Sequence, residues 1–293
     1  MSKKLNLNWH YHRFIAIALT LSILLLNYFL SFSHTASLIF LTLLIISAIP
    51  HGAYDWIEAK HRFVNFFSKG FVWFLLIYLL LGLSFILLWL VAPLFVLITM
   101  LFISAYHFGL DDNLSATKNW RSNSIYFMRE ITFFNLVILT HEKVIVTLFA
   151  QLVGENKFAT IQAFLINWHL PMLIITLSFI VIVFYSQRKN KYHLLEYALL
   201  LSLFATLNPL LSFATYFAIW HAPRHLLKAT TQYPPKKGQM IIILLVSVVT
   251  CLSAGLIFML LTNVVSLEIA WLRTLFVGLF ALTVPHMLWR YCV

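Results

Sequence analysis

Apolar runs of about 20 residues recur along this chain between short polar segments, and they constrain its fold more than any other feature. An α-helix rises about 1.5 Å per residue, so each run is long enough to cross about 30 Å of hydrocarbon. Of the 293 residues, 62% are hydrophobic and 10% are charged, and the mean hydropathy is +0.91. Such values are typical of a polytopic membrane protein. We therefore expect an all-α bundle of about ten transmembrane helices.

The positive charges predict the orientation of these helices. The 20 Lys and Arg residues and the net charge of +11 gather in short segments between apolar runs. This pattern is typical of cytoplasmic loops that face anionic lipid, and it argues against nucleic acid as a partner. When the helices are traced in order, only Lys143, Lys157 and Arg273 fall outside. We therefore expect both termini in the cytoplasm and a multi-pass protein of the cytoplasmic (inner) membrane.

The whole chain, residues 1–293, is expected to form one membrane-embedded domain, because no stretch is long or polar enough for a separate soluble one. The first apolar run is too long for a signal peptide and lacks a small-residue cleavage site. The mixed segment 141–170 is expected to be an external loop with an interfacial helix. Arg129 and Glu130 enter the first turns of the helix predicted at 125–140, where they are expected to pair with each other or with neighbours.

Five histidines follow or end apolar runs, and in this tracing all of them lie at the inner ends of descending helices. An ionisable group at membrane depth is costly and usually functional. Neutral imidazole is the commonest metal ligand in proteins, so several at one depth predict a metal site. The alternative for each alone is a buried, hydrogen-bonded side chain or an interface anchor. The five are His51, His107, His221, His225 and His286, of which His221 and His225 share one helix face and His286 fits the alternative best.

Two carboxylates, Asp55 and Asp111, each follow a site histidine by four residues. On a continuing helix such a carboxylate lies on the same face and can accept the second imidazole proton. The alternative is an ordinary boundary carboxylate in water, which is the expectation for Asp112. Prolines next to or between the histidines free a backbone carbonyl and bend the helix, which would aim the imidazoles inward. These prolines are Pro50, Pro223 and Pro285.

These motifs, taken together, resemble the Brp/Blh family of membrane β-carotene 15,15'-dioxygenases. The resemblance covers most of the chain by the order and spacing of the motifs, although the segment 141–170 has no match. It implies an iron-dependent enzyme that uses O2 to split β-carotene at its central double bond into two molecules of all-trans-retinal. The partners it implies are β-carotene, O2, the lipid bilayer and a retinal-binding rhodopsin as product acceptor. The motifs are Pro50-His51-Gly52 with Asp55, His107-Phe108-Gly109 with Asp111, Trp220-His221 with Arg224-His225, and Pro285-His286.

The resemblance assigns four of the histidines as ligands of Fe(II): His51, His107, His221 and His225. Four neutral imidazoles leave one or two coordination positions open for O2 and the alkene. His286 is expected beside the ligands or as an alternative ligand, and Asp55 and Asp111 are expected to orient ligands. Tyr54 and Trp220 are expected to line the substrate path, and Arg224 to face the inner headgroups or pair with an Asp.

Two other classes of function fit part of the pattern. Another His-metal membrane oxygenase, such as a lipid desaturase, uses several His boxes with paired histidines, whereas this sequence has a single His-x3-His box and no His-His pair. A transporter or proton relay would favour broken helices in matched halves, which the sequence lacks. A retinal-binding pump needs a Lys in the middle of a helix to form the Schiff base, and no predicted helix of this sequence has one. The residues by themselves do not choose among iron, zinc and copper, because imidazole suits all three.

Overall fold

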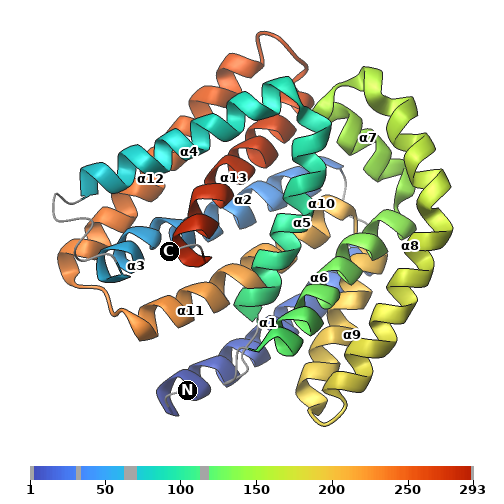
Figure 1. The fold of residues 1–293 in the computed structure, drawn as a ribbon, viewed down its shortest axis with the longest axis horizontal. Helices are drawn as coiled ribbons and strands as arrows, with labels where there is room; N and C mark the ends of the chain where they lie inside the picture. Colours follow the sequence, from blue (N-terminus) through green and yellow to red (C-terminus); the bar gives the residue numbers. More distant parts are fainter. Residues whose placement is uncertain (1–2, 31–33, 63–70, 113–118, 292–293) are drawn as a thin grey trace. The chain divides into compact units, whose positions relative to one another are not determined.

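The computed structural model describes residues 3–30, 34–62, 71–112 and 119–291, and every regular element in these ranges is a helix (Figure 1). Two of the lysines whose positive charge indicated a cytoplasmic segment, Lys69 and Lys118, lie outside the described residues. Cys292 lies outside them too. In chain order the elements are α1 (Lys3–Leu30), α2 (His34–Ala53), α3 (Asp55–Arg62), α4 (Phe71–Val91), α5 (Pro93–Asp112), α6 (Trp120–Thr140), α7 (Glu142–Val153), η1 (Glu155–Lys157), α8 (Phe158–Gln187), α9 (Lys191–Thr206), α10 (Pro209–Thr215), η2 (Tyr216–His221), α11 (Ala222–Gln232), α12 (Lys237–Leu261) and α13 (Leu267–Tyr291).

Among the described residues, six helical segments are long and apolar enough to cross a membrane, and they involve α1, α4, α5, α8, α12 and α13. The pair α6 and α7 would make a seventh span, bent by 103°. On α12 the side chains of Leu244, Leu252 and Leu256 are exposed, which suits a surface that faces lipid tails. The expectation of an all-helical chain with several apolar spans is confirmed.

The segment 141–170 differs from its expected form as a loop with an interfacial helix, because it is helical over most of its length. Gly154 ends α7 with φ of 124°, a backbone conformation that glycine adopts most readily. After the short η1, helix α8 begins at Phe158 and continues through Pro171 to Gln187. Pro171 therefore lies inside α8, since a long apolar helix can tolerate the loss of one backbone hydrogen bond. The external location of this segment and the single-domain organisation stay predictions.

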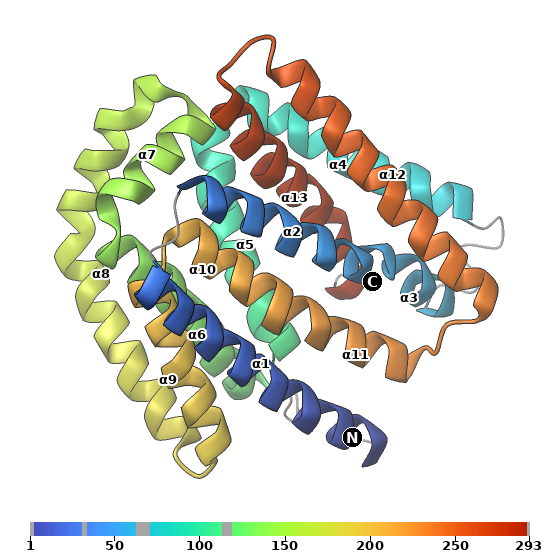
Figure 2. The same cartoon turned by 180° about the vertical axis from the view of Figure 1, so that it is seen from behind.

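One compact unit comprises Met1–Ser47, Leu101–Ala150 and Gly154–Leu227. In this unit α6 packs against α8 and α9, and α1 packs along α9 and η2 (Figure 2). A Cβ added to Gly109 on α5 would lie 2.9 Å from the backbone nitrogen of Phe127 on α6, so only glycine allows this close approach. Its fully buried apolar residues include Phe133, Leu200, Leu203 and Ala214.

The other compact unit comprises Ala48–Met100, Gln151–Val153 and Lys228–Val293. Here α13 packs against both α4 and α12, and the short α3 contacts α4 and α13 (Figure 1). A Cβ on Gly82 of α4 would lie 3.2 Å from the carbonyl oxygen of Ala281 on α13, so these two helices also approach closely. The N–H that an α-helix would direct at this carbonyl belongs to residue 285, which is a proline and has none.

The helix expected to end at His225 consists of three consecutive pieces. Asn208 caps the first piece, α10, by accepting a hydrogen bond from the Leu210 N–H at 3.0 Å. The second piece, η2, is a π-helix, and the Ala222 N–H donates to the carbonyl of Phe217 five residues earlier. The third piece, α11, extends to Gln232. A π-helical turn is rare and is frequently found at functional sites, and this one ends on a candidate ligand, His221.

Candidate metal centre

Three of the predicted ligands, His107, His221 and His225, come together within the first compact unit. His107 lies on α5, His221 ends η2 and His225 lies on α11, and at most 1% of each residue is exposed. The ring centroids of His107 and His221 are 5.0 Å apart, and those of His221 and His225 are 6.4 Å apart. Imidazoles that are more than 100 residues apart in the chain are therefore neighbours in a buried environment.

Asp111 lies between two of these rings. Its Oδ2 atom is 4.0 Å from Nε2 of His107 and 4.0 Å from Nε2 of His225. The predicted position on the face of His107 is confirmed, and the structure adds His225 as a second neighbour. One ligand atom from each of His107, Asp111 and His221 lies within 4.8 Å of the others. Ligand atoms at about 2.1 Å from one ion lie about 3 to 4 Å apart, so small side-chain movements would bring this set to binding distance.

The donor set fits a first-row transition metal. Imidazole nitrogens dominate it, and a single carboxylate accompanies them, which suits iron, zinc or copper better than magnesium or calcium. The ring of Phe108 lies 4.4 Å from that of His221, and Phe217 stacks on His221 at 5.7 Å between centroids. These aromatic rings make the wall of the site apolar, so it suits an apolar substrate.

The second compact unit holds the other two histidines. The ring centroids of His51 and His286 are 5.5 Å apart. Nδ1 of His286 lies 2.7 and 2.8 Å from the two oxygens of Asp55, so it donates a hydrogen bond to this carboxylate. The hydroxyl of Tyr78 lies 3.1 Å from Oδ2 of the same carboxylate. Asp55, expected to orient the histidine four residues before it, is thus the acceptor for a histidine 231 residues away.

This pairing fixes the tautomer of His286. Because Nδ1 carries the proton, Nε2 holds the lone pair that a metal ligand needs, and a carboxylate in this position raises the basicity of the ring. Tyr78 was missed from the sequence. The available signal was the phenolic hydroxyl of Tyr78 within the apolar run of α4. A buried phenolic hydroxyl usually has a polar partner, so its presence indicated a polar group nearby.

The two residues expected to line the substrate path are both buried. The Tyr54 hydroxyl donates to the carbonyl oxygen of Tyr233 at 2.5 Å. Burial and the nearby charge of Glu58 raise the pKa of Tyr54 to about 12, so this donor stays protonated. The Trp220 indole N–H donates to Oγ1 of Thr20 at 2.9 Å. Their role toward substrate stays a prediction, and both rings have a structural partner.

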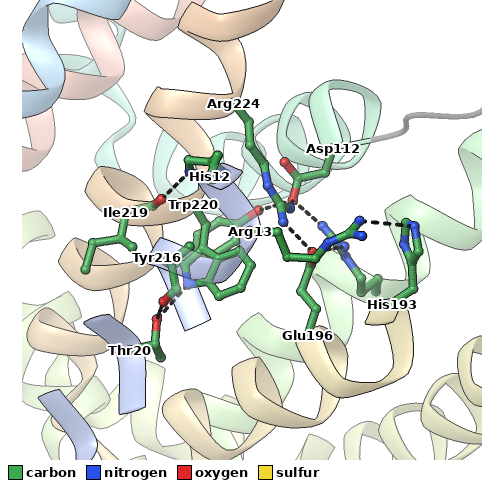
Figure 3. Close-up of polar contacts among 12 residues, drawn as sticks. His12, Arg13, Thr20, Asp112, His193, Glu196, Tyr216, Ile219, Trp220 and Arg224 are labelled. Atoms are coloured by element: carbon green, nitrogen blue, oxygen red, sulfur yellow. Dashed lines mark hydrogen bonds and ion pairs between the residues drawn. The ribbon is translucent and has the colours of Figure 1, made fainter. Parts of the chain in front are cut away.

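The first unit also holds a buried network of charges, part of which Figure 3 shows around Asp112, Glu196 and Arg224. Arg224 donates from Nη1 to Asp112 at 2.9 Å, and its Nη2 lies 2.7 Å from Oε1 of Glu196. Arg129 also donates to Asp112. The sequence expectation of Asp112 as a carboxylate in water is wrong, because only 2% of this residue is exposed. The six members are Arg13, Asp112, Arg129, Glu130, Glu196 and Arg224.

Other expectations for this network have mixed outcomes. The predicted pairing of Arg129 with Glu130 is confirmed, with Nη2 to Oε1 at 2.7 Å. Of the two alternatives for Arg224, the structure bears out an ion pair with an Asp. Arg13 and Glu196, joined at 3.3 Å, were missed as members. The signal for Glu196 was a carboxylate inside an apolar run, which demands a cation nearby.

Comparison with known proteins adds an independent line of argument. A family model described as "Beta-carotene 15,15'-dioxygenase" matches residues 42–290. A relative from uncultured marine bacterium 66A03, which carries the name "Beta-carotene 15,15'-dioxygenase", is 30% identical over 270 residues, which cover 85% of this chain and 90% of the relative. No solved structure matches the chain.

Proposed function

Because the chain belongs to the β-carotene 15,15'-dioxygenase family, we propose that it splits β-carotene with O2 at the central double bond, giving two molecules of all-trans-retinal. The observation that carries this proposal from the structure is the buried group of His107, His221, His225 and Asp111. Buried imidazoles at this spacing suit a transition metal, and the aromatic wall beside them suits a hydrocarbon.

Fe(II) is the proposed cofactor, with His51, His107, His221 and His225 as its ligands. The support comes from each compact unit separately, since each brings at least two imidazoles close together. Fe(II), when bound with open coordination positions, supplies the electrons that activate O2. His286 is proposed as an adjacent group or an additional ligand, because the Asp55 carboxylate holds its ring with the Nε2 lone pair available.

The side chains around this centre have simpler tasks. Phe108 and Phe217 keep water away from His221 and offer an apolar surface to a conjugated hydrocarbon. Asp111 holds a negative charge near the imidazoles of His107 and His225, which offsets part of the charge of a divalent ion. In the proposed reaction both oxygen atoms of O2 end as aldehyde carbonyls, so no net proton transfer is needed. The tasks of Phe108, Phe217 and Asp111 accordingly involve no proton transfer.

The membrane location completes the proposal. β-Carotene dissolves in lipid and not in water, so an enzyme embedded in the bilayer meets its substrate directly. We place the protein in the cytoplasmic membrane with about ten spans and both termini inside, because most Lys and Arg residues then face the cytoplasm. α2, α9 and the continuous run α10–η2–α11 would supply the spans beyond the seven apolar candidates. A retinal-binding rhodopsin is the proposed acceptor of the product.

The decisive experiment expresses the chain in cells that make β-carotene. We expect the pigment to disappear and retinal to accumulate, and 18O2 should label both aldehyde products. Apocarotenals of unequal length would contradict central cleavage, and undiminished β-carotene beside well-inserted protein would contradict the enzymatic function. His221→Ala and His225→Ala should each lose retinal formation and bound iron. His169→Ala, at a half-exposed histidine of α8, is the matched control and should keep both.

A further inference from the structure

Pro223 follows the π-helical turn that carries His221, so a carbonyl of this turn lacks its α-helical donor. In an α-helix the carbonyl of Ile219 would accept from the N–H of residue 223, but Pro223 has no N–H. Ile219 is partly buried, and a backbone carbonyl in such a position is normally satisfied by another donor when the helical one is missing. The geometry of this turn therefore depends on what the rest of the fold directs at Ile219.

The first helix, α1, supplies that donor. Nε2 of His12 lies 2.9 Å from the Ile219 carbonyl oxygen, and because a carbonyl only accepts, the imidazole donates (Figure 3). About two turns further along α1, Oγ1 of Thr20 accepts from the indole N–H of Trp220. The Thr20 hydroxyl proton goes to the carbonyl of Ala16 at 2.7 Å, so its lone pairs face the indole. Two consecutive residues immediately before His221 are thus fixed by polar contacts with α1.

A third contact reaches the residue before His225. Nε of Arg13 donates to Oε2 of Glu196 at 3.3 Å, and Oε1 of Glu196 lies 2.7 Å from Nη2 of Arg224. The contacts of α1 therefore lie on both sides of His221: two are direct, and the third reaches Arg224 through Glu196. A helix that served only as an apolar anchor would not need three polar side chains directed at the π-helical turn and at the carboxylate that holds Arg224.

This role belongs to a part of the chain that lies outside the residues matched by the family model. The match to the β-carotene 15,15'-dioxygenase family begins at residue 42, whereas α1 ends at Leu30. We propose that α1 is a positioning element: His12 and Thr20 hold the π-helical turn so that the imidazole of His221 keeps its place beside His107 and Asp111. The significance of this for metal binding rests on the proposed function.

Single substitutions in the full-length protein test the proposal. Thr20→Val keeps the size of the side chain and removes the acceptor for Trp220, whereas Thr20→Ser keeps it. His12→Leu removes the donor to Ile219, whereas His12→Gln keeps an N–H donor. Thr250→Val on α12 is the matched control, because the Thr250 hydroxyl bonds only to its own helix, at the Val246 carbonyl.

Two measurements follow these variants in detergent-purified protein. Amide hydrogen exchange over residues 216–225 of the metal-free protein should become about two- to tenfold faster in Thr20→Val and His12→Leu, the range expected when one buried hydrogen bond is lost. Binding of Co(II), used as a spectroscopic probe, should weaken by about tenfold, with an altered ligand-field absorption spectrum. The Ser and Gln variants and Thr250→Val should match the wild type in both measurements.

The outcomes separate this inference from the proposed function. Exchange and Co(II) spectra of Thr20→Val and His12→Leu that equal the wild type would overturn the role of α1. Equal effects in Thr250→Val would also overturn it, because they would indicate general destabilisation. A wild-type protein that binds no Co(II) or Fe(II) would instead contradict the proposed function, and hydrogen exchange would still decide whether α1 holds the turn.

Discussion

Replacing Asp112 with Asn should strongly destabilise the protein, because this carboxylate joins two arginines in the buried network. It accepts from Arg129 and, at 2.9 Å, from Nη1 of Arg224, and its side chain is fully buried. The network contains three arginines and three carboxylates, so its charges balance. Asp112→Asn preserves the shape of the side chain and leaves one positive charge without a partner.

The size of the effect follows from the burial. Removing one member of a buried ion pair costs about 3–5 kcal/mol, and the Asn oxygen can still accept one hydrogen bond, so we expect about 3 kcal/mol. The chain has 293 residues, and at about 2.1 cal/mol/K of unfolding entropy per residue each kcal/mol shifts Tm by about 1.6 °C, which gives a decrease of about 5 °C.

Thermal unfolding in detergent, followed by circular dichroism, measures this shift. Glu142→Gln is the control, because Glu142 forms a partly exposed pair with His169 at 3.5 Å. Such a pair contributes about 0–1 kcal/mol, so Tm should change by less than about 3 °C. The double variant Asp112→Asn, Arg224→Gln restores neutrality and should lose less stability than the two single variants added together. An Asp112→Asn protein as stable as Glu142→Gln would refute the reasoning.

Three further predictions concern packing and the two histidine sites. Gly109→Ala should destabilise the fold by about 1–3 kcal/mol, because the new Cβ would meet the backbone of α6 at 2.9 Å. Gly255→Ala on α12 meets nothing within 4 Å and should leave Tm unchanged or raise it, so a comparison of the two melting curves tests close packing. Asp55→Asn should weaken iron binding by about 10- to 100-fold, since the ring of His286 loses its carboxylate partner, and metal titration would detect this. Tyr54→Phe should lower the free energy of unfolding by about 1 kcal/mol, because one hydrogen bond is lost. A decrease of less than about 0.3 kcal/mol in thermal unfolding would count against this prediction.

The sequence by itself determined the helical class, the apolar spans and the neighbours within one helix. Length and hydropathy are local properties, and a spacing of four residues places two side chains on one face wherever the helix lies. Asp111 therefore lies beside His107 as predicted. Arg129 pairs with the adjacent Glu130, because opposite charges within an apolar run seek each other. The same reasoning identified the histidines of α5 and η2 that the fold brings together.

Only the tertiary structure decided which residues of different helices meet. The rotation of each helix about its axis and its crossing with its neighbours are not encoded in local periodicity, so the sequence predicted water around Asp112 and His51 as the partner of Asp55. Packing buries Asp112 between two arginines and places Asp55 where it accepts a hydrogen bond from His286. It also directs His12 at a carbonyl that Pro223 leaves without a helical donor. The proline is visible in the sequence, but the donor that compensates for it comes from a helix about 200 residues away, where only the packing of the chain could place it.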